Sequence, residues 1–373
     1  MALRAFRYRF EPTAEQAALL SRTFGCVRFV WNHALAERQR AYAMECRSVS
    51  YVETSAMLTA LKADPDHAWL REVSSVPLQQ ALRHLQGAYA AFFTKRSRYP
   101  RFKRKHACRE SAEFTRSGFS LHGGQLRLAK LSEPLAIRWS RPLPEGAQPS
   151  SVTVSRDAAG RWFVSILVDD PTIRALPRVE ETVGIDAGLT SLVTLSTGEK
   201  VTNPRHERRD REKLAKAQRT LARKAKGSAN RAKAKRKVAR VHARIADRRG
   251  DHLHKLTTRL VHENQVLAIE DLTVRNMQRN HSLARAISDA SWSQMRCMLE
   301  YKAAWYGREV VAVDRWYPSS KTCSTCGTMA AHMPLSVRDW SCSGCGTQHD
   351  RDVNAARNIL TAGLAAATPV EAA

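Results

Sequence analysis

Three widely separated carboxylates stand where the sequence predicts the end of a strand or the start of a helix. Asp186 follows the apolar run Val-Gly-Ile, Glu270 follows Val-Leu-Ala-Ile, and Asp352 precedes the amphipathic segment VNAARNIL. If the two strands are neighbours, both of their acids emerge at the same edge of a sheet. Mg²⁺ prefers carboxylate oxygens, and a pair of divalent ions ~4 Å apart supplies what phosphodiester hydrolysis needs. The three acids therefore predict a site for two Mg²⁺ ions, with Mn²⁺ as a possible substitute.

Each acid also has an ordinary structural interpretation. Any of the three could be a cap or turn residue, and Asp352 in particular could be the N-cap of the helix that follows it. Asp350 lies two residues earlier and is the main rival to Asp352. Asp271, next to Glu270, is expected to point elsewhere.

Four cysteines have the spacing of zinc ligands. They are Cys323, Cys326, Cys342 and Cys345, in the pattern C-x2-C-x15-C-x2-C. A glycine follows each pair and lets the chain fold back around an ion. Four thiolates leave no open coordination position, so the predicted Zn²⁺ is structural and would fix the segment that delivers Asp352. A redox dithiol is the alternative.

The charge balance favours a polyanionic partner. The 373 residues contain 61 Lys and Arg against 35 Asp and Glu, which gives a net charge of +26. Nucleic acid is the first candidate. An anionic membrane is the second, but no run reaches the ~18 apolar residues needed to span a bilayer. The opening MALRAFRYRFEP lacks the apolar stretch of a secretion signal, so we expect a cytoplasmic, nucleoid-associated protein without a membrane partner.

Two basic segments are candidate nucleic-acid contacts. Residues 204–262 hold 21 Lys and Arg against 5 Asp and Glu, in a helical pattern with a break at Gly227-Ser228. In residues 99–105, YPRFKRK, aromatic and cationic side chains alternate, which suits base stacking combined with phosphate pairing. The individual candidates are Arg101, Lys103, Arg104, Lys105, Lys233, Lys235, Arg236, Lys237 and Lys321. A solvated helical hairpin and an ordinary basic loop are the alternatives.

The chain is long enough for two or three domains of mixed composition. A strand over residues 3–10 precedes helical patterns that run to about residue 96, with predicted capping boxes at Thr13 and Ser50. Short runs between turns over about 100–170 indicate antiparallel strands of a small barrel or sandwich. From residue 182 the pattern is that of strands that begin as a hairpin and later alternate with helices, which predicts a mixed α/β sheet.

Four motifs in this order resemble one known family. GIDAGL, IEDL, PSSKTCSTCG with CSGCG, and HDRDVNAARNIL are similar to those of the TnpB proteins of insertion sequences, the OrfB type related to compact type V CRISPR nucleases. FGCVRFVWNHAL and YPRFKRK match too, so the resemblance covers nearly the whole chain. The C-terminal motifs are the most specific and the helical region is the loosest.

The resemblance implies a multidomain α+β protein with an RNase H-like (RuvC) core interrupted by a zinc ribbon. Its divisions would be a wedge-like β-barrel nucleic-acid-binding domain (1–10 and 97–175), a helical recognition domain (11–96), a nuclease domain (182–318 and 347–362) that carries the basic hairpin 204–262, a zinc ribbon (319–346) and a disordered tail (363–373). Asp186, Glu270 and Asp352 would be its catalytic acids.

The implied activity is RNA-guided cleavage of DNA. A guide RNA from the transposon end would pair with target double-stranded DNA beside a short motif, and the single RuvC site would cut that DNA using Mg²⁺. Base pairing would read the sequence while basic side chains hold the A-form hybrid by its backbone. The alternatives are an RNA-guided DNA-binding repressor that does not cut, and a transposase proper.

Overall fold

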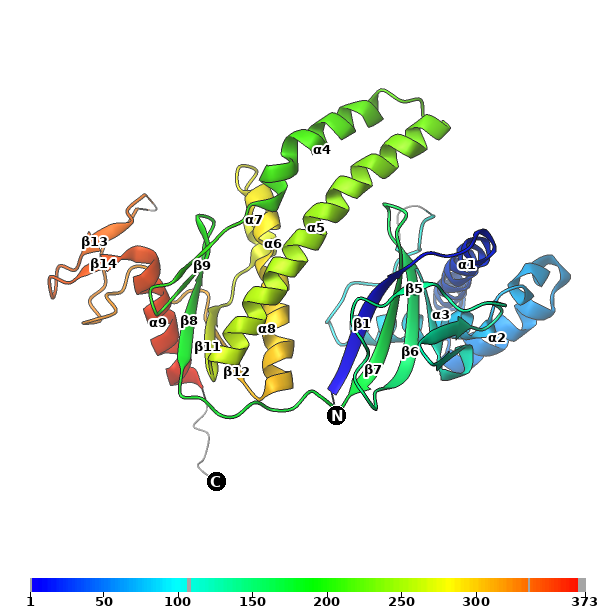
Figure 1. The fold of residues 1–373 in the computed structure, drawn as a ribbon, viewed down its shortest axis with the longest axis horizontal. Helices are drawn as coiled ribbons and strands as arrows, with labels where there is room; N and C mark the ends of the chain where they lie inside the picture. Colours follow the sequence, from blue (N-terminus) through cyan, green and yellow to red (C-terminus); the bar gives the residue numbers. More distant parts are fainter. Residues whose placement is uncertain (1, 106–108, 335, 368–373) are drawn as a thin grey trace. The chain divides into compact units, whose positions relative to one another are not determined.

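The computed structural model describes residues 2–105, 109–334 and 336–367, and the chain forms two compact units, Met1–Thr172 and Ile173–Ala373 (Figure 1). No helix within the described ranges is both long and apolar enough to cross a membrane.

The first unit combines helices with an antiparallel sheet. Its helices are α1 (Ala14–Glu45), α2 (Tyr51–Ala63), η1 (Pro65–Arg71), α3 (Ser75–Phe93) and η2 (Arg116–Gly118). Its strands are β1 (Ala2–Phe10), β2 (Glu110–Thr115), β3 (Phe119–His122), β4 (Gln125–Leu128), β5 (Ile137–Arg138), β6 (Gln148–Arg156) and β7 (Trp162–Asp170). Five strands form a sheet in the order β2-β6-β7-β1-β5, and β3 pairs with β4 in a separate hairpin.

Local sequence signals define the helix starts in this unit. The side chain of Thr13 accepts from the backbone N–H of Gln16, and Ser50 accepts from that of Glu53. Both predicted capping boxes are therefore confirmed. Apolar residues of α1 and α3 pack with alternate residues of β1, β6 and β7 in one core.

The antiparallel strands are confirmed, but the barrel is not. Every pairing in the five-stranded sheet is antiparallel, as the alternating sequence pattern indicates. β2 and β5 stand at its two edges, and within the described residues no pairing joins them to close the sheet. Alternation predicts which strand residues face a core, but it does not tell whether edge strands meet.

The second unit is built on a mixed sheet with helices on both faces. Its strands are β8 (Thr182–Ala187), β9 (Ser191–Leu195), β10 (Lys200–Thr202), β11 (Val266–Glu270), β12 (Glu309–Val313), β13 (Asp339–Ser341) and β14 (Gln348–Asp350). Its helices are α4 (His206–Ala222), α5 (Ala229–Glu263), α6 (Val274–Met277), α7 (Ala284–Ala290), α8 (Trp292–Tyr306) and α9 (Arg351–Ala366). The main sheet has the order β10-β9-β8-β11-β12, while β13 and β14 form a hairpin. β9 is antiparallel to β8 and β10, whereas β8, β11 and β12 are parallel, so the predicted mixed sheet is confirmed.

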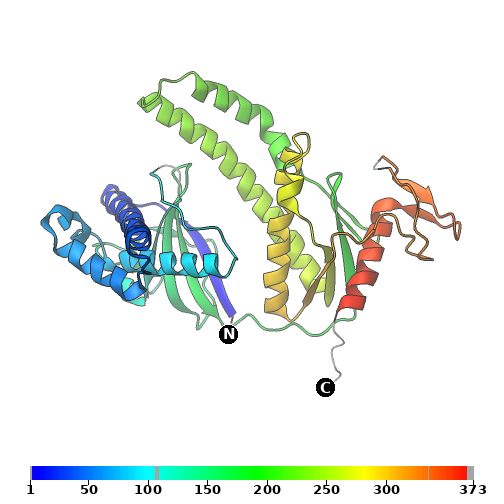
Figure 2. The same ribbon diagram turned by 180° about the vertical axis from the view of Figure 1, so that it is seen from behind.

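The two faces of this sheet are covered by different helices, as Figures 1 and 2 show from opposite sides. Val183, Ile185, Leu267 and Ile269 pack in a core with apolar residues of α5 and α8. The intervening residues of β8 and β11 face α9, because successive side chains on a strand point to opposite faces. Ala268 accordingly packs with Ile359 of α9.

Helix α9 lies unusually close to the sheet, and two glycines allow it. A Cβ at Gly184 would lie 2.0 Å from the backbone oxygen of Ala356 and 2.8 Å from the backbone nitrogen of Leu360. A Cβ at Gly363 would lie 2.5 Å from the Cβ of Ala268. The helix that carries Asp352 is therefore seated directly on β8 and β11.

Replacing Gly184 with alanine should unseat α9. We expect Gly184→Ala to lower the free energy of unfolding by ~3 kcal/mol, since the added methyl group meets backbone atoms that cannot rotate away. Gly250→Ala in α5 is the matched control, because its added Cβ would meet nothing within 4 Å apart from the backbone of its own helix. That control should gain up to ~1 kcal/mol from helix propensity. Urea unfolding measures both, and equal stability of the two variants would contradict the close seating of α9.

The basic region forms the expected hairpin. α4 ends at Ala222 and α5 begins at Ala229, with Gly227 at a positive φ of 84° and Ser228 as N-cap of α5. At the other end of the unit the tail expectation is partly wrong. Helix α9 runs to Ala366, and Gly363 within it packs against Ala268 of β11. The last part of the expected tail, residues 368–373, lies outside the described residues.

Candidate active site and zinc ribbon

Asp186 and Glu270 lie at matching positions on adjacent parallel strands. The register pairs the residue that precedes one acid with the residue that precedes the other. Adjacent strands are about 4.8 Å apart. Each acid shares its face of the sheet with the residue two positions earlier, Gly184 or Ala268, and both of these contact α9. Asp186 and Glu270 therefore point to the α9 side of the sheet.

Asp352 occupies the first turn of α9, and Asp350 caps the helix. Asp350 Oδ1 accepts from the backbone N–H groups of Asp352 (3.1 Å) and Val353 (3.0 Å). Its other oxygen lies 2.5 Å from Lys200 Nζ. The alternative that Asp352 is the N-cap is therefore wrong, and the rival carboxylate Asp350 is already engaged. Asp352 itself lies 3.3 Å from an Arg338 nitrogen, and 24% of its side chain is exposed.

Glu270 and Asp352 both act electrostatically on Asp186. Burial, with smaller contributions from the charges of Glu270 and Asp352, raises the pKa of Asp186 to about 8. Burial also raises the pKa of Glu270, opposed by a hydrogen bond from Ser319. Negative charges gathered in a partly desolvated place favour a proton or a cation among them. The charges of Glu270 and Asp352 both reach Asp186, and the shared catalytic site of the three acids stays a prediction.

The carboxylates do not meet at one point. Within the described ranges, the four cysteine sulfurs are the one group of at least three potential ligands that all lie within 4.8 Å of one another. A two-ion site does not need such crowding. Each Mg²⁺ is bound by one or two carboxylates and keeps water or phosphate oxygens as its other ligands.

The raised pKa of Asp186 predicts how the stability of the metal-free protein depends on pH. The folded chain holds a proton up to about pH 8, whereas the unfolded carboxyl releases it near 3.8. Asp186 therefore lowers the free energy of unfolding as pH rises across this window, by at most ~1.4 kcal/mol per pH unit. Asp186→Asn should remove that slope. The free energy of unfolding of this variant, relative to that of the unaltered protein, should therefore rise from pH 4 to pH 8. Urea unfolding without added divalent ions, and without a chelator that strips zinc, measures it; parallel curves for both proteins would contradict the pKa shift.

Glu270 and its neighbour Asp271 have different hydrogen-bond partners. Ser319 Oγ donates to Glu270 Oε1 at 3.0 Å. Asp271 instead pairs with Arg296 at 2.6 Å and with Arg315, and these contacts lower its pKa. Asp271 therefore points elsewhere, as expected, and its charge is neutralised.

The four cysteines form a cluster whose dimensions fit zinc. Sγ of Cys323 lies 3.7 Å from that of Cys345, and Sγ of Cys326 lies 3.5 Å from that of Cys342. Sulfurs at ~2.3 Å from a tetrahedral ion are about 3.8 Å apart, so the spacing suits Zn²⁺ bound by four thiolates.

The backbone around the two pairs repeats one turn. The N–H of Cys323 donates to the oxygen of Thr328, and that of Cys342 donates to the oxygen of Thr347. Gly327 and Gly346 each adopt a positive φ, 78° and 72°. The hydroxyl and the backbone N–H of Thr328 lower the pKa of Cys326 to about 6, which favours a thiolate ready to bind metal.

His349 lies beside the first cysteine of this cluster. It is buried, and its Nε2 lies 3.0 Å from Sγ of Cys323. Burial lowers the pKa of His349 and so favours the neutral ring, which can donate Nε2–H to the sulfur. Such a contact orients a metal ligand from outside the coordination shell.

Two buried asparagines of α9, neither of which was predicted as a functional residue, connect this helix to the segment of the first cysteine pair. Asn354 and Asn358 donate to the backbone oxygen of Thr322 at 2.7 and 2.6 Å, and Asn358 also donates to that of Ser319 at 2.7 Å. Asn354 Oδ1 accepts from the N–H of Ser324. One network therefore joins the first cysteine pair, the helix of Asp352 and the serine that holds Glu270.

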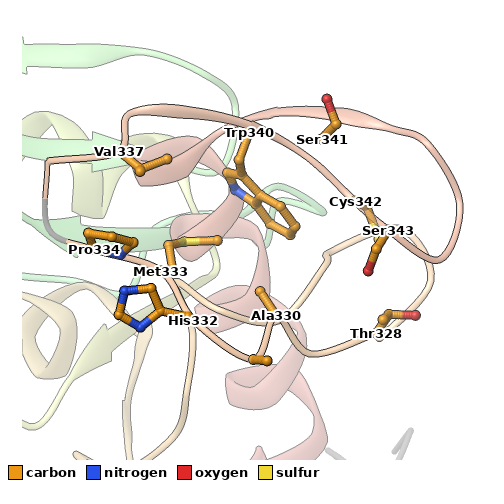
Figure 3. A pocket seen from close by; sticks show the side chains of 11 residues that line it. Thr328, Ala330, His332, Met333, Pro334, Val337, Trp340, Ser341, Cys342 and Ser343 are labelled. Carbon is orange, nitrogen blue, oxygen red and sulfur yellow. The ribbon is translucent and has the colours of Figure 1, made fainter.

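A pocket lies within the cysteine segment, lined by side chains from residues 328–343 (Figure 3). Its lining includes Met333, Val337 and the indole of Trp340, whose ring packs against His349 with centroids 4.9 Å apart. The pocket belongs to the packing of the ribbon and is separate from the carboxylates, none of which lines it.

The basic candidates lie in two surroundings. Lys233, Lys235, Arg236, Lys237 and Lys321 are exposed. In the other segment, Arg101, Arg104 and Lys105 are exposed while Lys103 lies over the Trp31 ring at 3.8 Å. The Trp31 indole donates to the oxygen of Arg101, and Asn32 forms two hydrogen bonds with the backbone of Lys103. This segment is therefore fixed along α1, and whether any of these side chains contacts nucleic acid stays a prediction.

Comparison with family models places three segments of the chain. Residues 165–281 match the OrfB_IS605 model, described as "Probable transposase". Residues 292–359 match the Cas12f1-like TNB domain, and residues 1–46 match a helix-turn-helix domain model of OrfB_IS605. The last segment forms β1 and the single helix α1 in this structure.

Two bacterial relatives cover almost the whole chain. A Streptomyces pristinaespiralis protein named "Putative RNA-guided DNA endonuclease" is 69% identical over 97% of this chain and 90% of its own length. The chain belongs to the OrfB/TnpB family. An Escherichia coli K12 member with the same name and the suffix InsQ is 34% identical over 97% of this chain and 93% of its own length.

The fold has a counterpart among solved structures. The protein in the cryo-EM structure of the Cas12f1–sgRNA–target DNA complex matches with a TM-score of 0.59 at 13% identity, over 96% of this chain and 98% of that chain. The multidomain α+β architecture is therefore shared with Cas12f1.

Proposed function

We propose that this family member is an insertion-sequence RNA-guided DNA endonuclease that cuts target DNA by metal-dependent hydrolysis at Asp186, Glu270 and Asp352. The observation that carries the proposal is the placing of Asp186 on the α9 side of the sheet, where burial, with the charges of Glu270 and Asp352 added, raises its pKa to about 8. The strand order β10-β9-β8-β11-β12, with an antiparallel hairpin start and a parallel continuation, is that expected of an RNase H-like core.

The residues of the chain have separate parts in this reaction. Asp186 and Glu270 offer oxygens from a rigid sheet edge, and Asp352 offers its own from the helix opposite. Ser319 orients the Glu270 carboxylate through its 3.0 Å hydrogen bond. When bound, Mg²⁺ or Mn²⁺ ions would activate a water molecule and stabilise the leaving oxygen. Since a protonated carboxyl is a poor ligand, cation binding should strengthen as pH rises toward 8.

We propose a guide RNA from the transposon end and target double-stranded DNA as partners. The net charge of +26 and the exposed lysines and arginines of the α4–α5 hairpin support a polyanionic partner. The names of the relatives describe RNA-guided DNA endonucleases, and the matched Cas12f1 structure holds a guide RNA and target DNA.

The test is to reprogram the guide. The protein purified with its copurifying RNA should cut DNA in the presence of Mg²⁺, and a changed guide segment should move the cut to the matching new target. Target binding without cleavage would favour the repressor, and strand-transfer products would favour the transposase. Either result would overturn the proposal.

A further inference from the structure

Trp316 is the most exposed large apolar side chain in the described part of the chain, with 83% of its surface accessible. Tryptophan is among the most buried residues on average, so an exposed one on an otherwise folded segment calls for a reason. It lies in the sequence DRWYPSS between β12 and the first cysteine pair.

The backbone of Trp316 is held in place on both sides. Its own N–H donates to Asp314 Oδ1 at 2.8 Å, and the N–H of Tyr317 donates to the Asp314 oxygen at 3.1 Å. The side chain of Tyr317 packs with Val313 and Ile359 beneath α9. The turn therefore directs one aromatic ring into the core and presents the other to solvent.

Both ends of this turn lie beside Glu270. Val313, the last residue of β12, is the register partner of Glu270, and Ser319 donates its hydroxyl to the Glu270 carboxylate. Trp316 stands midway, three residues from each. Three extended residues span at most ~11 Å, which bounds the distance between the Trp316 backbone and the positions beside Glu270.

We propose that Trp316 stacks on a base of the DNA strand that is cut and so positions that strand over Asp186 and Glu270. The inference rests on the proposed function, since it needs a DNA strand at the carboxylates. An indole offers a flat face to any base, which suits an enzyme whose sequence choice is made by base pairing elsewhere. Lys321, exposed on the same segment, adds a positive charge suited to the strand's phosphates.

The stacking itself can be measured without cleavage. An Asp186→Asn protein–RNA complex would be bound to target DNA that carries 2-aminopurine at successive positions around the cut. We expect fluorescence quenching at one or two positions, full recovery of the signal with the added change Trp316→Ala, and partial quenching with Trp316→Phe. Leu364→Ala, an exposed apolar residue near the other end of α9, is the control and should leave the quenching unchanged.

Cleavage gives the second readout. In the protein that retains Asp186, Trp316→Ala should weaken target-strand binding or lower cleavage on the order of 10-fold, with zinc content and melting temperature unchanged. Quenching that persists in Trp316→Ala would overturn the proposed stacking. A Trp316→Ala variant that changes only its oligomeric state would also overturn it, because the ring would then belong to a protein contact. If the unaltered complex cuts no DNA at all, the proposed function fails. If the unaltered complex cuts normally but the Asp186→Asn complex shows no quenching, only the proposal for Trp316 fails.

Discussion

Asp186→Asn is expected to reduce DNA cleavage by at least ~10³-fold while guide RNA binding stays nearly unchanged. The substitution keeps the size of the side chain but removes a charged oxygen ligand at the sheet edge. Electrostatic stabilisation by a bound divalent ion is worth several kcal/mol in the transition state, which corresponds to a loss of this size. Cleavage of labelled target DNA and gel-shift binding of the RNA measure the two effects.

The matched control for this variant is Asp251→Asn. Asp251 is an exposed carboxylate of α5 that pairs only at the surface with Lys255, and its loss should change cleavage less than about twofold. Cleavage retained by Asp186→Asn would remove the proposed mechanism. A loss of RNA binding in the same variant would show that the change disturbs the fold and not the chemistry alone.

Cys342→Ser is expected to abolish zinc binding and to lower cleavage together with stability. A three-thiolate remnant binds Zn²⁺ far more weakly, and the binding free energy of a structural zinc is folding free energy. The ribbon is tied to α9 through Asn354 and Asn358, so its loosening reaches both Asp352 and Ser319. Zinc content by mass spectrometry, thermal unfolding and target cleavage report the three effects.

Cys297→Ser supplies the comparison for the zinc variant. Cys297 is an exposed free thiol of α8, so its replacement should leave zinc content and cleavage as they were. A Cys342→Ser protein that folds and cuts normally without zinc would contradict the role given to the ribbon.

The positions of Asp186 and Glu270 at strand ends and the clustering of the four cysteines could be predicted because their signals are local. Asp186 and Glu270 each end an apolar run that reads as a buried strand, and the cysteine pairs have a spacing that few other structures share. The break at Gly227-Ser228 is equally local, since a glycine at positive φ and an N-cap serine are sufficient to separate two helices.

What the sequence did not reveal depends on which surfaces meet. Asn354 and Asn358 are four apart on α9 and poor helix formers, which is a weak signal of a buried polar contact. Their partners are backbone oxygens of the segment before the cysteines, and no pattern in the sequence identifies these. The role of Gly184 likewise appears only when α9 is placed on the sheet. Closure of the first sheet likewise depends on whether its two edge strands pair, and the alternation of apolar and polar residues does not encode this.

The binding of divalent ions at the three acids tests the central claim most directly. Crystals of the protein soaked in Mn²⁺ and measured at the manganese absorption edge would show where the ions lie. We expect anomalous peaks for one or two ions among Asp186, Glu270 and Asp352, and none there in Asp186→Asn. A zinc signal at the cysteines with no manganese between the carboxylates would contradict the account.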